Sequence, residues 1–89
     1  MAKLTCWKAL ILEALSDVDE TPADISASTF KSGENELMFY PGYGRPEGIP
    51  FTLWTHKRVY FPVQYDGSEW VTSVPRDPCE EATSHIGGG

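Results

Sequence analysis

The sequence has few basic residues and no long hydrophobic run. Only seven of its 89 residues are Lys or Arg, against thirteen Asp and Glu, so the formal net charge is −6. Binding to nucleic acid needs clustered Lys and Arg, and this balance argues against it while permitting a basic partner. The apolar stretch "LTCWKALILEAL" is interrupted by Lys8 and Glu13, is too short to span a bilayer, and lacks the small-residue cleavage site of a signal peptide. We therefore expect a cytoplasmic protein without membrane or direct nucleic-acid contacts.

Cysteine and histidine are scarce as well, which bears on metal sites and catalysis. The chain has two of each: Cys6, Cys79, His56 and His85. Zinc sites show closely spaced ligand pairs such as Cys-x₂-Cys, and no such pair occurs here. Nothing in the sequence orients a cysteine toward a histidine as a nucleophilic dyad, and a GxSxG elbow is absent. The sequence thus predicts free thiols, no metal and no cofactor, and it favours a non-catalytic protein without excluding an enzyme.

Length and composition fit one small globular domain. Hydrophobic residues make up 40% and charged residues 22% of the chain, values typical of folded domains rather than disordered chains. We expect residues 1–89 to form a single domain, with residues 84–89 as a flexible tail. A chain this short buries a modest share of its surface, so oligomerisation would add useful burial.

The first part of the chain has helical patterns. A helix over residues 4–18 would have one broad apolar face and a polar opposite face. Thr21, Pro22 and Asp24 form the start signal of a second, short helix over residues 22–28. Between residues 30 and 40 two alternatives stay open: a helical turn capped by Ser32, or a strand over residues 37–40. Residues 40–50, rich in Gly and Pro, are expected to be a loop.

The second half predicts a three-stranded antiparallel meander over residues 51–55, 58–65 and 69–74. Asp66-Gly67 tolerates the positive φ of a type I′ turn, which pairs Tyr65 with Ser68 and continues outward to Val59 with Val74. Directly opposed residues share a face, so we expect a core face, covered by the first helix, that carries Trp54, Val59, Phe61, Val63, Tyr65, Trp70, Thr72 and Val74. Together these elements give an α+β fold, with an N-terminal amphipathic helix and a short second helix packed on the meander.

The opposite face of the predicted sheet is more apolar than a solvent-facing side should be. The same register places Tyr60, Pro62 and Val71 there, beside Phe51 and Leu53 of the preceding strand. Either residues 30–50 fold back over this face or another subunit covers it. Because large exposed apolar patches are rare on monomers, we expect a homo-oligomer that associates through Phe51, Leu53, Tyr60 and Val71.

A first candidate binding site lies in the Gly-rich loop. Tyr40, Tyr43 and Arg45 are of the residue types that are frequent at binding hot spots. The Gly-x-Gly of this loop lacks the strand-to-helix context of a phosphate site, so we expect a contact surface rather than a phosphate cradle.

A second candidate is a basic tip. His56, Lys57 and Arg58 lie at the turn between two predicted strands, and Arg76 lies near the same end of the sheet. Such a tip either keeps an exposed turn soluble and protects a sheet edge, or contacts an anion or an acidic partner.

One stretch carries a resemblance to other proteins. The run "PFTLWTHKRVYFPVQYDGSEWVTSVPRDPC", followed by "HIGGG", resembles a group of small uncharacterised bacterial proteins associated with phage and mobile gene cassettes. The resemblance covers mainly residues 50–89. It implies a small cytosolic accessory protein, and it implies no catalytic residue.

Three functions are compatible with these observations. We expect a small cytosolic non-catalytic binding or interaction protein that self-associates. One alternative is a small-molecule-binding protein or minor enzyme with a pocket between residues 40–50 and the sheet, lined by Tyr40, Tyr43 and Arg45. The other is an acidic modulator of a nucleic-acid-binding partner, in which the acidic side chains should cluster on one exposed face.

Overall fold

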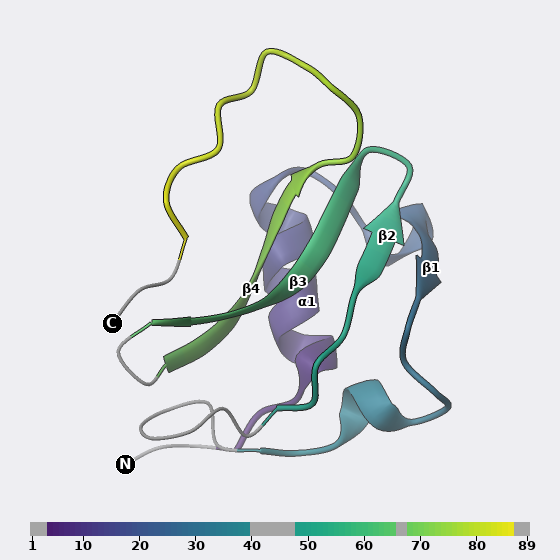
Figure 1. Cartoon of the computed structure of the whole chain (residues 1–89). Helices are drawn as coiled ribbons and strands as arrows, with labels where there is room; N and C mark the ends of the chain where they lie inside the picture. The colour runs from purple at the N-terminus through teal and green to yellow at the C-terminus, as the bar shows by residue number, and fades with distance from the viewer. Residues whose placement is uncertain (1–3, 40–47, 66–67, 87–89) are drawn as a thin grey trace.

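A helix and an antiparallel sheet form two layers (Figure 1). The computed structural model describes residues 4–39, 48–65 and 68–86. Along the chain come α1 (Trp7–Asp17), a 3₁₀ turn (Pro22–Asp24), β1 (Ile25–Ser28), a second 3₁₀ turn (Glu34–Glu36), β2 (Leu53–Thr55), β3 (Arg58–Tyr65) and β4 (Ser68–Pro75). The four strands lie in the order β1-β2-β3-β4. The α+β class is confirmed, but the described residues hold one α-helix and four strands, where two helices and three strands were expected.

The helix α1 forms within the predicted range of residues 4–18 but begins only at Trp7, and Thr5 makes a bridge with Phe39 instead. Trp7, Ile11, Ala14 and Leu15 are buried, which is the i, i+4, i+7, i+8 stripe of a helix that packs on one side. The helix ends with Asp19 in the left-handed conformation at φ 59°. The backbone N–H of Glu20 donates to the carbonyl of Leu15 at 2.8 Å, and that of Asp19 donates to Ser16 at 3.2 Å. This pair of bonds is a Schellman motif, and it fixes the direction in which the chain leaves the helix.

The expected helix over residues 22–28 is wrong beyond its first turn. The Asp24 carboxylate accepts a hydrogen bond from the backbone N–H of Thr21 at 2.8 Å, so the start signal was correct. The chain then extends as β1, which pairs antiparallel with β2 and has an irregularity between Ile25 and Ala27. The sequence of β1 is Ile-Ser-Ala-Ser, and serine and β-branched residues propagate a helix poorly, so pairing with β2 prevails. Of the two alternatives left open for residues 30–40, the helical turn forms as a 3₁₀ turn over Glu34–Glu36, with Gly33 rather than Ser32 at its N-cap. Phe39 makes an isolated antiparallel bridge with Thr5.

The predicted register of the β3–β4 hairpin is confirmed pair by pair, from Tyr65 with Ser68 to Val59 with Val74. The β2–β3 register is confirmed for Leu53 with Tyr60 and for Trp54 with Val59. It does not continue to Pro62. Hydrogen-bonded pairs alternate along the β3–β4 ladder, and this alternation directs the nitrogen of Pro62 toward β2. Proline has no N–H to donate, so the β2–β3 ladder ends before it.

The predicted assignment of the two sheet faces is wrong. The helix α1 covers the face that carries Leu53, Tyr60 and Val71, and these residues are buried in the core together with Phe51. The self-association face proposed from the sequence is therefore the interior of a single chain. On the opposite face, which was expected to be the core, Val63 is buried, the side chain of Tyr65 lies outside the described part, and the other members are half-buried: Trp54, Val59, Phe61, Trp70, Thr72 and Val74.

Two buried hydroxyl groups on the covered face explain why α1 packs on this side of the sheet. Tyr60 and Thr55 lie on it and are fully buried, at 0% exposure each, and both hydroxyls hydrogen-bond to Glu20 just beyond α1. Buried hydroxyls need such a partner, and α1 can supply it only by lying on this side of the sheet. Both faces offered apolar area, so the strand pattern alone did not distinguish them.

The other end of α1 is held by residues between β1 and β2. Trp7 is 1% exposed, and its indole N–H donates to the carbonyl of Ile49 at 2.8 Å. Its ring lies 4.7 Å from that of Phe39 and 5.0 Å from that of Phe51, centroid to centroid. Phe30 stacks on Phe51 at 4.8 Å. The alternative in which residues 30–50 fold back over this sheet face is thus correct for the described part of that segment.

Candidate functional site

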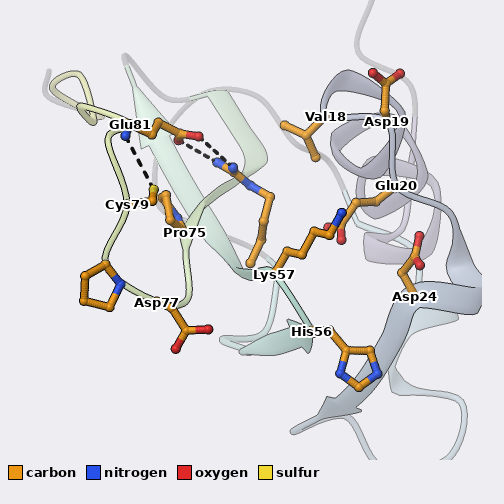
Figure 2. Close-up of a pocket in the computed structure, with 12 residues that line it drawn as sticks. Val18, Asp19, Glu20, Asp24, His56, Lys57, Pro75, Asp77, Cys79 and Glu81 are labelled. Carbon is orange, nitrogen blue, oxygen red and sulfur yellow. Dashed lines mark hydrogen bonds and ion pairs between the residues drawn. The ribbon is translucent and has the colours of Figure 1, made fainter.

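An open cleft of about 620 Å³ lies at the end of the molecule where α1 stops. Three segments line it: the end of α1 with the following turn, the β2–β3 turn at residues 56–58, and the chain after β4. Figure 2 shows Asp19, Glu20 and Asp24 on one side of the cleft and Asp77 and Glu81 on the other. Lys57, Arg58 and His56 line the same cleft. Carboxylates outnumber the permanent cations, and we call this site the acidic cleft.

The floor of the acidic cleft is a hydrogen-bond network around Thr55. Its hydroxyl donates to Glu20 Oε1 at 3.0 Å and accepts the backbone N–H of Arg58 at 2.9 Å, which closes the β2–β3 turn. Tyr60 donates its hydroxyl to the same Glu20 oxygen at 2.5 Å. Burial, followed by this bond to Glu20, raises the pKa of Tyr60. The phenol therefore stays protonated, and Glu20 has a fixed position at the rim.

A second network closes the cleft from the side of the chain after β4. The guanidinium of Arg58 holds both carboxylate oxygens of Glu81, each at 3.0 Å. It also donates from Nε to the hydroxyl of Ser73 at 2.6 Å and from Nη2 to the carbonyl of Ser73 at 3.1 Å. The bond to Arg58 lowers the pKa of Glu81, and the bond to Glu81 raises the pKa of Arg58. Both groups are therefore charged at neutral pH, in the bidentate geometry that Arg provides and Lys does not.

The structure brings the predicted basic tip together at this cleft. His56, Lys57 and Arg58 line it. Arg76 lies beside it, where its backbone N–H donates to the carbonyl of Lys57 at 2.8 Å and its Nη1 donates to the carbonyl of Thr55 at 3.0 Å. The tip is not a plain cationic patch, because acids surround it and Glu81 already binds Arg58.

Other candidate residues from the sequence lie elsewhere. Tyr40, Tyr43 and Arg45 fall outside the described residues. Both cysteines are free thiols, as expected. Cys79 lines the acidic cleft with His56, whereas His85 lies in a groove beside Trp70. In the described part of the chain, no group of three or more His, Cys, Asp or Glu side chains has an arrangement that could hold a metal ion.

Sequence reasoning missed the acids that define the site. Glu20 reaches partners 35 and 40 positions away, and Glu81 reaches one 23 positions away. No local spacing signals contacts of that kind. The one available signal was the grouping of acids at residues 17–24 and 77–81, which would have indicated a site only if the two segments were known to meet.

Comparison with known proteins adds no relative. No family model, no curated protein and no solved structure matches this chain. Across the described residues, no helix is both long enough and apolar enough to cross a membrane.

Proposed function

We propose that the protein is a small non-catalytic binding protein that holds a basic segment of a partner protein in the acidic cleft. The observation that carries the proposal is the charge of the cleft, where five carboxylates from both sides stand against Lys57 and Arg58. Arg58 is already engaged by Glu81. A Lys or Arg side chain of a partner would enter a negative field, which favours encounter with such a partner and opposes acidic ones.

The shape of the cleft supports a side chain or short segment as the occupant. A volume of about 620 Å³ lies in the range of sites that hold small ligands, and the cleft is open rather than enclosed. Asp19 and Asp77 line it on opposite sides (Figure 2), so a segment with several cationic side chains could present one to each side. Nucleic-acid-binding proteins expose clustered Lys and Arg. A nucleic-acid-binding protein is therefore one class of partner whose surface would fit the acidic cleft.

A titration followed by NMR tests the proposal. We expect a short Lys- and Arg-rich peptide to shift the backbone amide signals of residues 18–24, 56–58 and 77–81. A peptide of the same length rich in Glu and Asp should leave them in place. The affinity for the basic peptide should fall steeply with added salt, because exposed charges are screened.

A pair of matched variants locates the binding. Asp19→Asn removes one charge at the rim, and Asn tolerates the left-handed conformation found there, so we expect about a two- to fivefold weaker affinity. Glu13→Gln removes one charge from an exposed position of α1 outside the cleft and should change the affinity much less. Shifts of residues 56–58 by the acidic peptide alone would contradict the proposal and favour an anion site at the basic tip.

A further inference from the structure

The strand β4 is an edge of the sheet, and the chain after it returns along that edge without pairing with it. Residues 81–86 and Trp70, Thr72 and Ser73 of β4 line a common groove of about 370 Å³. Figure 1 shows this segment, in yellow, on the side of β4 that faces away from β3. Among the described residues, no backbone hydrogen bond joins residues 78–86 to β4. The edge is therefore partly covered, and no strand from the described part of the chain pairs with it.

The ladder geometry identifies the backbone groups that point outward from β4. Residues that flank a two-residue turn form a hydrogen-bonded pair, and hydrogen-bonded pairs then alternate along the ladder. With Tyr65 opposite Ser68, even-numbered residues of β4 bond to β3. The backbone bond from Arg76 to Lys57 fits this alternation. The N–H and C=O groups of Val71 and Ser73 consequently face the free edge.

Arg58 and Glu81 close one end of this edge. Arg58 reaches the outward carbonyl of Ser73 at 3.1 Å, and Glu81 holds the same guanidinium. Pro75, two residues further on, has no N–H to offer a new strand. Prolines, charges and covering segments are the devices by which proteins protect edge strands from pairing. The proline and the Arg58–Glu81 charges stand at the Ser73–Pro75 end. Around Val71 the strand has no proline, and its protection consists of Glu69 and of residues 81–86, which share the groove with Trp70 and Thr72.

We propose that the edge of β4 is a self-association site at which two copies pair their β4 strands antiparallel about Val71, and that the Arg58–Glu81 ion pair restrains this pairing by holding residues 81–86 beside the edge. A second copy fits because the strand is self-complementary in that register. Val71 would face Val71, Trp70 would face Thr72, and the one acid, Glu69, would face Ser73. No like charges would be opposed, and aromatic and β-branched neighbours stabilise a sheet across strands.

The size of the chain also favours this occupant. β4 is eight residues long, which is long for an unpaired edge. Pairing would join two four-stranded sheets and extend the half-buried outer face, to which Trp70 and Thr72 belong, across the two-fold axis. Small domains gain proportionally more than large ones from such added burial.

The test compares two charge reversals on adjacent residues. Glu81→Arg opposes Arg58 and should release residues 81–86, whereas Glu80→Arg makes the same change of net charge at an exposed neighbour. Sedimentation equilibrium over a wide concentration range gives the dimer dissociation constant of each. We expect the constant of Glu81→Arg to be at least threefold lower than that of Glu80→Arg. Equal constants, or masses of one chain for both variants at all concentrations, would overturn the proposal.

Amide hydrogen exchange on the unmodified chain and on Glu81→Arg identifies the interface without a further substitution. The amide of Val71 points outward, so its exchange should slow as dimer accumulates, and that of Trp70, already bonded to β3, should change less. Dimers in which the exchange of Val71 is independent of concentration would show another interface and would also overturn the proposal.

Discussion

The side chain of Arg58 connects the β2–β3 turn with β4 and with the chain after it. It extends from β3, binds both a hydroxyl and a carbonyl of Ser73 on β4, and holds the carboxylate of Glu81 in the following segment. All these bonds come from one planar guanidinium, whose rigid donor geometry makes them simultaneous. The same side chain is therefore central to the candidate site and to the proposed protection of the sheet edge.

The titration of Glu81 measures this contact directly. Arg58 lowers the pKa of Glu81 below the ordinary value of 4.5, so the ion pair contributes above that pH and is lost as the pH falls through the lowered value. Following the side-chain carboxyl carbon by NMR, we expect a midpoint below 4.5 in the natural chain. In Arg58→Gln the midpoint should rise toward the ordinary value. Identical midpoints in the two proteins would show that the pair does not persist in solution.

Tyr60→Phe tests the network on the floor of the cleft. The substitution keeps the buried ring and removes the hydroxyl that donates to Glu20. A buried hydrogen bond is lost and Glu20 loses one of its donors, so we expect unfolding in urea to show a loss of about 1–2 kcal/mol. Glu20→Gln weakens the same bond, and in a double-mutant cycle the two losses should be less than additive. Additive losses would mean that the two groups do not interact.

At the scale of elements, the pairing of β3 with β4 could be predicted from the sequence, but which face of the sheet is buried could not. The hairpin register could be predicted from the Asp-Gly dipeptide in the sequence, because a two-residue turn leaves one pairing, and that pairing is found. The period of two along a strand defines two faces but not which one is buried, and both carried aromatic and β-branched residues. β1 was missed because a short, fully exposed edge strand has no hydrophobic pattern. It forms because β2, far along the chain, offers it a partner, with Ala27 opposite Trp54 and Ser28 opposite Leu53.

The end of α1 offers a test at this scale. Asp19 sits at φ 59°, where glycine has no steric penalty and other residues do. Asp19→Gly keeps the Schellman motif, and we expect thermal unfolding to show a gain of about 0.5–1 kcal/mol. Asp17→Gly, two residues earlier in the last turn of the helix, should give no such gain. A loss at position 19 would indicate that its carboxylate stabilises the folded chain.

At the scale of the whole molecule, the core is built from segments far apart in sequence. Trp7 of α1 contacts Phe39 and Phe51 and hydrogen-bonds to Ile49, while Glu20 connects the other end of the helix to the sheet. The candidate site depends on the same long-range arrangement. The basic tip was predictable from a local cluster, and the acids that face it were not, since only the folded chain brings residues 19–24 and 77–81 to one cleft.

Gly48→Ala tests how closely these segments are packed. A Cβ at this position would overlap the indole ring of Trp7, and overpacking of a core costs about 1–3 kcal/mol. We expect that loss in the free energy of unfolding. Gly33→Ala is the control: its φ of 81° makes alanine unfavourable, but no atom lies near, so about 1–2 kcal/mol should be lost from the backbone alone. A fully tolerated alanine at position 48 would mean that Trp7 does not lie against this backbone.

The contact between Trp7 and Gly48 also constrains how the sequence can diverge in evolution. While an indole occupies position 7, a Cβ at position 48 overlaps its ring and is disfavoured, although the two positions are 41 residues apart in the sequence. A descendant that exchanges the tryptophan for a smaller side chain would leave space at position 48, and a larger residue there could then fill it. Homologous sequences, once aligned, should therefore show these two positions changing together, whichever partner each protein binds.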